Sequence, residues 1–233
     1  LKNISVPKDK ILVIGYGSSN GIDTNYFTRS EKVKRDANLY IKKYSLENMF
    51  NFIFVGRIVK DKGISELSSS FIKLNKKYKN TRLLLVGWEE NDLDPIPKET
   101  KEMIKLNKNI LNLGFKKDIR PFLAASNCLV LPSYREGFPN VVLQAGSMEV
   151  PAIVTNINGC NEIIKNEVNG LIIEPKNQKS LYLAMERIFL NSKLCNNLAK
   201  SSRKKIVEKF HNENFYNEVL SHYSNLNKEI VNA

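Results

Sequence analysis

Short apolar runs alternate with longer helical patterns along most of the chain, and this alternation restricts the fold more than any other feature of the sequence. Several runs are too uniformly apolar to have one face in water, which is typical of parallel strands buried on both faces. The expected strands are 11–15, 52–56, 82–87, 110–115, 128–133, 152–155 and 171–174. Helix-period patterns lie between most of them, at 64–78, 98–106, 119–125, 140–149 and 180–190. The sequence therefore predicts an α/β fold with one parallel sheet covered by helices on both faces.

The size and composition fit one large domain with a proper core, because the chain has 233 residues and is 42% hydrophobic. The longest apolar runs fall far short of the roughly 20 residues that span a bilayer, so we expect no membrane-crossing segment. The first residues include neither an initiator Met nor the apolar core of a signal peptide, which predicts that the chain was cut from something longer. The three cysteines are widely spaced, which favours a reducing, cytoplasmic location over a disulfide framework or a zinc site.

The net charge of +12 is the one strongly biased total. Such a charge is compatible with nucleic acid, an anionic membrane surface or anionic ligands. The lysines cluster on helical patterns, and the sequence lacks the interleaved aromatic and arginine residues of single-strand binders. Solvated helix faces are therefore the favoured interpretation, and a membrane-facing role stays open.

In a parallel sheet, ligands bind where strands end and loops lead into helices, and the loop GRIVKDKG after the run 52–56 is one such place. Its flanking glycines allow a tight turn that would aim Arg57 and Lys62 at one spot. Arg offers a planar fork and Lys a mobile point charge, which together suit a diphosphate. The alternative is that both cations simply lie in a solvated loop.

The stretch YREGFPNVVLQA supplies a second candidate anion site. Pro139 suits the first position of a helix, so we expect a helix that begins at about Phe138. The free N–H groups of Asn140 and its neighbours, at the positive end of the helix, would attract an anion. Gly137 would let the backbone come close to it.

Two polar side chains of the same stretch face the expected ligand. We expect Glu136 to stay ionised and to bind a sugar hydroxyl beyond the phosphates, although it could merely complement the helix dipole. Gln144 would lie in the second turn, about 7 Å along the helix from its start, an offset like that from a diphosphate to a ribose. Its amide can accept from one hydroxyl and donate to another. A partly buried polar residue without a ligand is the alternative.

Other chemistries are disfavoured. The glycines of IGYGSSNG are one residue too widely spaced for a G-x-G-x-x-G dinucleotide loop, which argues against a nicotinamide or flavin cofactor. His211 and His222 have no carboxylate and nucleophile beside them in the sequence, so catalytic or metal roles for them are not expected.

Seven motifs in register resemble the C-terminal, donor-binding half of a two-domain B-type glycosyltransferase of family 4. They are GSSNGIDTNYF (17–27), VGRIVKDKG (55–63), LLLVG (83–87), LGFKKDI (113–119), LVLPSYREGFPNVVLQA (129–145), PAIVTNINGCNEII (151–164) and NGLIIEP (169–175). The resemblance covers nearly the whole chain and implies a Rossmann-like domain, one half of a B-type enzyme.

The resemblance also implies roles for individual residues. Arg57 and Lys62 would hold the nucleotide diphosphate, and Glu136, the candidate catalytic residue, would contact the donor sugar. The family's second Glu, which binds the ribose, is replaced here by Gln144. Because a neutral amide makes weaker bonds than a carboxylate, donor binding should be modestly weakened. The nucleobase would lie near Phe115 and its two neighbours in the chain.

The function implied is transfer of a glycosyl group, retaining and without an obligatory metal, from a nucleotide-diphosphate sugar, with a UDP-sugar the expected donor. The acceptor, a glycan or lipid-linked molecule, would bind an N-terminal domain that this sequence does not contain, and a lipid-linked acceptor would bring the protein to the inner face of the membrane. The sequence predicts a donor-binding domain at 1–211 and a C-terminal amphipathic helix at 212–233, with an apolar stripe at Phe215, Val219, His222, Leu226 and Ile230.

Two rival interpretations remain open. A non-catalytic nucleotide-binding or assembly module would fit the replacement at Gln144 and the missing half. A nucleic-acid-binding protein would show a steep dependence of binding on salt concentration. No nucleic-acid partner is expected from the sequence.

Overall fold

The computed structural model describes residues 7, 10–14, 16–18 and 20–231. The described chain contains a six-stranded sheet, all parallel, in the order β3-β2-β1-β4-β5-β6. The strands are β1 (Phe50–Val55), β2 (Thr81–Val86), β3 (Ile110–Gly114), β4 (Cys128–Leu131), β5 (Ala152–Thr155) and β6 (Gly170–Ile173). The expected parallel sheet is confirmed.

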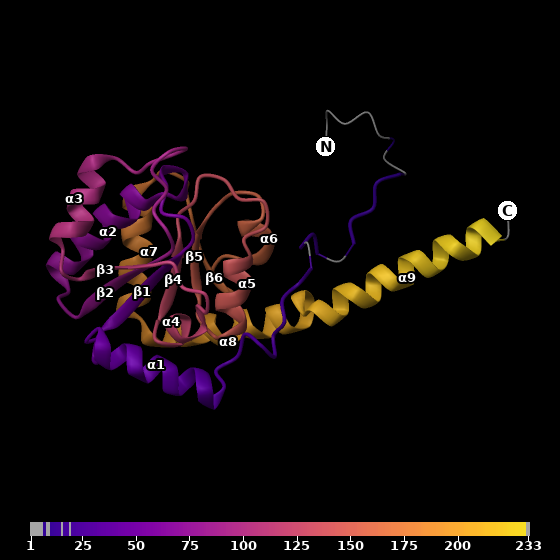
Figure 1. The fold of residues 1–233 in the computed structure, drawn as a ribbon, viewed down its shortest axis with the longest axis horizontal. Helices are drawn as coiled ribbons and strands as arrows, with labels where there is room; N and C mark the ends of the chain where they lie inside the picture. The colour runs from indigo at the N-terminus through magenta and orange to yellow at the C-terminus, as the bar shows by residue number, and fades with distance from the viewer. Residues whose placement is uncertain (1–6, 8–9, 15, 19, 232–233) are drawn as a thin grey trace.

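Helices cover both faces of this sheet (Figure 1). They are α1 (Glu31–Lys43), α2 (Ile64–Lys77), α3 (Lys98–Leu106), α4 (Arg120–Ala124), α5 (Asn140–Ser147), α6 (Cys160–Ile163), α7 (Gln178–Leu190), α8 (Ser192–Phe210) and α9 (Asn212–Val231), with a 3-10 turn η2 (Lys60–Lys62). One group consists of α2, α3 and α7, which pack together, whereas α1 packs on α4 and α5 packs on α6 and α8. Right-handed crossovers in this strand order place the first group and the crossover helices α4 and α5 on opposite faces.

The core lies in the strands and the helix faces that cover them. In β1, Phe52, Ile53 and Phe54 are completely buried, as are Leu83 and Leu129 in the strands on either side. Side chains on both faces of these strands are removed from water, which explains why the runs are continuously apolar rather than alternating.

The order of strands reverses between β1 and β4, which are hydrogen-bonded neighbours although β2 and β3 lie between them in the chain. In open parallel sheets, the ligand-binding crevice lies outside the carboxyl ends of two such strands. The loop after β1 contains Arg57 and Lys62, and the loop after β4 contains Glu136. The fold therefore brings the two loops chosen from the sequence to the two sides of this crevice.

One expected strand is wrong. Residues 11–14 form no strand, and Leu12 and Val13 are 60% and 66% exposed. The last residue of the predicted run, Gly15, lies outside the described residues. An apolar run becomes a strand only where another strand pairs with it, and this segment pairs with none of the six strands.

Helix α1 was not expected from the sequence. Val33 and Ala37 are buried in it, and Tyr40 and Ile41 also pack against the core. Its helical period was therefore a detectable signal that was missed.

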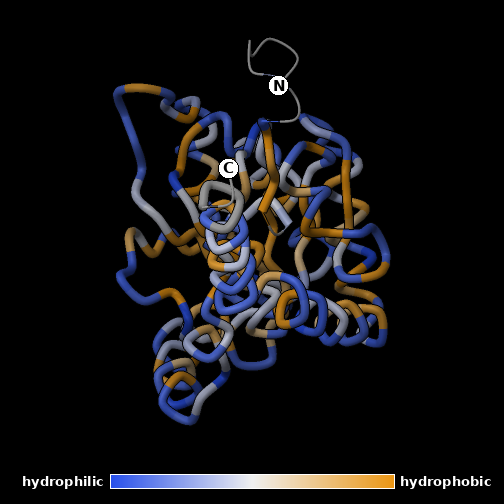
Figure 2. The backbone as a smooth tube through the Cα atoms, turned by 90° about the vertical axis from the view of Figure 1, so that its right-hand side faces the viewer, coloured by the Kyte–Doolittle hydropathy of each residue, from blue (hydrophilic) through white to orange (hydrophobic). Residues whose placement is uncertain are grey.

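The last helix, α9, projects away from the sheet (Figure 1). Figure 2 looks roughly along it and shows mostly hydrophilic colours. Phe215, Val219 and His222 are half-buried, whereas Leu226 is exposed. The side chain of Ile230, the last member of the predicted stripe, lies outside those described. Within residues 7, 10–14, 16–18 and 20–231, none of the helices combines the length and apolar character needed to cross a membrane.

Candidate functional site

The loop after β1 turns sharply at a glycine where any side chain would be strained. Gly63 has a φ of 69°, and a Cβ atom added to it would lie 2.2 Å from the carbonyl oxygen of Pro132, the first residue after β4. A left-handed backbone conformation and the lack of a side chain are both required here. Gly63 thus allows the loop after β1 to lie directly against the loop after β4.

The loop after β4 leads into α5, whose start differs from the expectation. The helix begins at Asn140, and Pro139 is its N-cap rather than its first residue, with an extended ψ of 97°. The expected start at about Phe138 was therefore too early, because a proline also fits the extended backbone before a helix. Asn140 is exposed at the start of the helix, where the first backbone N–H groups have no partner within the helix.

Three polar contacts join these two loops. The backbone N–H of Tyr134 donates to the carbonyl oxygen of Asp61 at 2.8 Å, and Arg135 Nε donates to Asp61 Oδ2 at 3.0 Å. Lys62 Nζ lies 2.8 Å from Glu136 Oε1, with side chains only 16% and 14% exposed. A cation and a carboxylate therefore face each other where the loops after β1 and β4 meet.

The other predicted cation points to the opposite side. Arg57 Nη1 donates to Glu90 Oε2 at 2.7 Å, in the loop after β2. The backbone holds this loop beside the one after β1, since Ile58 N–H donates to the carbonyl oxygen of Trp88 at 2.9 Å. Arg57 and Lys62 thus lie in one loop, but different carboxylates bind them. Glu90 was not singled out from the sequence, because nothing in the pattern GWEEND indicates which glutamate reaches an arginine of another loop.

An apolar slot of about 260 Å³ adjoins Arg57. Its walls include the rings of Trp88 and Phe115, whose centroids are 5.5 Å apart and whose planes are tilted by 50°. Both side chains are more than half exposed, at 52% and 61%. The resemblance predicts a nucleobase near Phe115, whereas Trp88 was missed, although it is the one tryptophan of the chain and closely follows an expected strand.

The remaining predicted residues surround the start of α5. Gln144 lies in its second turn with a half-buried side chain. The ring of Phe138 is partly buried and packs on Phe210, with centroids 5.8 Å apart. Gly137 is exposed, and its carbonyl oxygen lies against Gly159, where an added Cβ would come within 2.0 Å.

A buried thiol lies near the ion pair. Burial raises the pKa of Cys160 to about 12, the negative charge of Glu136 acts in the same direction, and Lys62 opposes it. The thiol stays protonated at neutral pH and is a poor nucleophile. Among the described residues, His, Cys, Asp and Glu side chains form no group of three that could ligate a metal ion.

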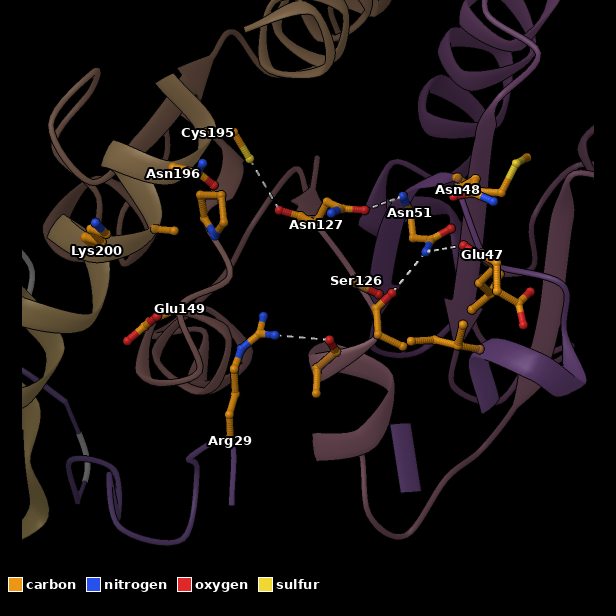
Figure 3. Close-up of a pocket in the computed structure, with 17 residues that line it drawn as sticks. Arg29, Glu47, Asn48, Asn51, Ser126, Asn127, Glu149, Cys195, Asn196 and Lys200 are labelled. Atoms are coloured by element: carbon orange, nitrogen blue, oxygen red, sulfur yellow. Dashed lines mark hydrogen bonds between the residues drawn. The ribbon is translucent and has the colours of Figure 1, made fainter. Parts of the chain in front are cut away.

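A second cleft, of about 590 Å³, lies at the opposite edge of the sheet, where the strands begin (Figure 3). It is lined by Asn51 and Asn127 beside the starts of β1 and β4, and by Arg29. The guanidinium of Arg29 donates to the carbonyl oxygens of Met148 and Ala124, at 2.8 and 3.2 Å, and so caps the ends of α5 and α4. None of the site residues predicted from the sequence lines this cleft.

Comparison with known proteins gives a family match and curated relatives. The family model described as "Glycosyl transferases group 1" matches residues 37–205. The capsular polysaccharide biosynthesis glycosyltransferase CapM of Staphylococcus aureus is 34% identical over 224 residues, which are 95% of this chain and 57% of CapM. An Escherichia coli UDP-Gal:alpha-D-GlcNAc-diphosphoundecaprenol alpha-1,3-galactosyltransferase is 34% identical over 217 residues, 90% of this chain and 53% of that enzyme.

The fold is shared with solved structures. A glycosyltransferase from Rickettsia africae superposes with a TM-score of 0.84 and 24% identity, covering 96% of this chain and 59% of that one. At this identity the likeness concerns the fold. The chain spans about half the length of the curated relatives it matches.

Proposed function

Because the chain belongs to the group 1 glycosyl transferases, we propose that it binds the nucleotide-diphosphate sugar donor of a glycosyltransferase, at the crevice between β1 and β4. Within that group we assign it to the two-domain B type of family 4, as its C-terminal half. The domain boundary follows the same proposal, with donor binding in residues 1–211 and α9 as an appended helix.

The pairing of Lys62 with Glu136 carries this proposal. It joins the loops after β1 and β4 at the crevice, and both side chains are mostly buried. A diphosphate would replace Glu136 as the anion bound to Lys62, and Arg57 would turn from Glu90 to the other phosphate. Glu136, once released, would accept a hydrogen bond from a sugar hydroxyl. The backbone N–H groups around Gly137, Phe138 and Asn140 would complete the anion site.

The base and ribose would both lie on one side of the diphosphate, and the donor sugar on the other. The slot with Trp88 and Phe115 offers ring faces for a nucleobase, beside Arg57. Gln144, in the second turn of α5, would bind the ribose hydroxyls. We propose a UDP-sugar as the donor, since the similar E. coli enzyme is a UDP-Gal-dependent transferase.

The acceptor would be a glycan or a lipid-linked molecule, bound by the half of the protein that the curated relatives have and this sequence does not include. The E. coli relative is named for such an acceptor, a sugar linked to diphosphoundecaprenol. An acceptor of this kind would place the reaction at the cytoplasmic face of the membrane. The cations of the crevice would neutralise the leaving diphosphate, so that transfer needs no bound metal.

A donor-binding module without transferase activity is the second candidate, and the replacement of a carboxylate by Gln144 favours it. The full-length polypeptide should be incubated with a panel of UDP-, GDP- and ADP-sugars and lipid-linked acceptors, and products identified by mass. The proposed function predicts a product one glycosyl unit heavier with a UDP-sugar. Saturable UDP binding without any product would support the second candidate, and the absence of both would contradict the proposal.

A further inference from the structure

The contact between Arg57 and Glu90 suggests how donor affinity is set. Arg57 Nη1 lies 2.7 Å from Glu90 Oε2, and the Glu90 side chain is only 18% exposed, against 47% for Arg57. The carboxylate is thus the better shielded partner, while the cation is open to solvent on its other side. A contact of this kind holds the guanidinium in one place and also occupies one of its donors.

Backbone hydrogen bonds hold the segment of Glu90 beside the loop that contains Arg57. Residues Ile58 and Glu89 form a parallel bridge beyond the ends of β1 and β2. Two further bonds tie the loops farther along, from Lys60 N–H to the carbonyl oxygen of Asp94 at 3.0 Å and from Asp61 N–H to Asp94 Oδ2 at 2.7 Å. Glu90 therefore lies on a segment that is fixed on both sides.

The neighbouring glutamate points elsewhere and provides a comparison. The carboxylate of Glu89 pairs with Lys101 of α3 and not with Arg57. The two adjacent glutamates carry the same charge in the same loop, but only Glu90 reaches the proposed diphosphate site. An effect of local charge in general would appear at both positions, whereas an effect on Arg57 would appear only at Glu90.

A bound diphosphate and Glu90 would compete for one cation. Both are anions that bind the same guanidinium, and a phosphate placed on Arg57 would lie close to the Glu90 carboxylate and be repelled by it. A nucleoside without phosphates meets no such repulsion. The contact therefore acts against the charged part of the donor and not against its base or ribose.

We propose that Glu90 is a resident counter-anion of Arg57, which the donor's diphosphate must displace, and that it lowers affinity selectively for phosphorylated ligands. This role rests on the proposed function of the crevice. Glu136 occupies Lys62 in the same way, but it is also the proposed contact of the donor sugar. Glu90 is thus the position at which the counter-anion role can be tested separately.

The test compares Glu90→Gln with the matched control Glu89→Gln, in the chain as it stands, by calorimetric titration with UDP and with uridine. Glu90→Gln keeps the shape and removes the charge. We expect it to raise UDP affinity about two- to fivefold, the factor that corresponds to the free energy of a partly exposed ion pair. Uridine affinity should stay unchanged. Glu89→Gln should change neither affinity. Glu90→Ala, with a melting curve to confirm folding, should reproduce the gain.

The outcomes separate this role from the proposed function. Unchanged UDP affinity in Glu90→Gln, beside intact binding by the wild type, would overturn the counter-anion role. Weaker UDP binding would overturn it too, and would show that Glu90 orients Arg57 toward the phosphate. An equal gain for uridine would also overturn it, because the effect of Glu90 would then not depend on the phosphates. If neither wild type nor variant bound UDP, the proposed function would fall, and the role of Glu90 with it.

Discussion

The ammonium of Lys62 and the carboxylate of Glu136 face each other at 2.8 Å across the crevice between the loops that follow β1 and β4. The two residues are 74 positions apart in the sequence and meet because the strand order reverses between them. A pair with such low exposure is costly to leave without partners, so a ligand that enters must offer an anion to the lysine and a hydroxyl to the glutamate. A nucleotide-diphosphate sugar offers both.

The side chain of Gln144 should set the strength of ribose binding. A carboxylate accepts charge-assisted hydrogen bonds from ribose hydroxyls that are about twice as strong as those of an amide. We expect Gln144→Ala to lower UDP affinity severalfold and Gln144→Glu to preserve or improve it, as measured by calorimetry. Equal affinity of all three proteins would remove Gln144 from the site.

Two glycines of the crevice should respond differently to the same substitution. Gly63→Ala forces a left-handed backbone and a clash with Pro132, so we expect it to lower the free energy of unfolding by about 2 kcal/mol or more. An alanine Cβ at Gly137 meets nothing within 4 Å, so Gly137→Ala should stay within about 0.5 kcal/mol of wild type while weakening UDP binding. Urea denaturation measures the first effect, and similar losses of stability in both variants would contradict this account of the loops.

The guanidinium of Arg29 should contribute to stability and not to donor binding. It caps the carboxyl ends of α4 and α5 in the cleft of Figure 3, at the edge of the sheet far from the crevice. Since hydrogen bonds from a charged donor are worth about 2 kcal/mol, Arg29→Ala should lower the melting temperature by about 5 °C. UDP affinity should be unchanged. A large loss of affinity in a folded variant would show that Arg29 does affect donor binding at the opposite edge of the sheet.

The buried thiols should make the protein less stable in alkali. Burial raises the pKa of Cys160 to about 12 and of Cys195 to about 11, whereas unfolded thiols ionise near pH 8.5. The unfolded state therefore loses these protons first, and the free energy of unfolding falls as the pH rises above about 8.5. Urea denaturation between pH 7 and 10 should show a shallower decline for Cys160→Ala than for wild type. Parallel declines would show that this thiol does not contribute.

Most of the sheet was predictable because the strands other than the edge strand β3 are largely buried on both faces and appear as nearly continuous apolar runs. The same signal failed at residues 11–14, where Leu12 and Val13 are apolar but have no strand beside them in the described chain. Burial depends on which segments pair, and a single run of letters does not contain that information.

The loops of the candidate site and their charged residues were predictable from the sequence. Arg57, Lys62 and Glu136 follow strands whose ends meet, and the meeting of Lys62 with Glu136 follows from the strand order. The pairing of Arg57 with Glu90 and the slot beside Trp88 depend on how the loop after β2 bends over β1, which the sequence does not indicate. The start of α5 was misplaced because Pro139 fits both the helix and the extended residue before it.

The most direct test of the donor site is a calorimetric titration of the wild-type chain, Arg57→Ala and Lys62→Ala with UDP and with uridine. Both cations are proposed to bind the diphosphate only, so the account predicts one saturable UDP site in the wild type. Each substitution should weaken UDP binding at least about tenfold, the loss of one charge-assisted contact, and leave uridine binding within about twofold. Equal losses for UDP and uridine, or no saturable UDP binding by the wild type, would contradict it.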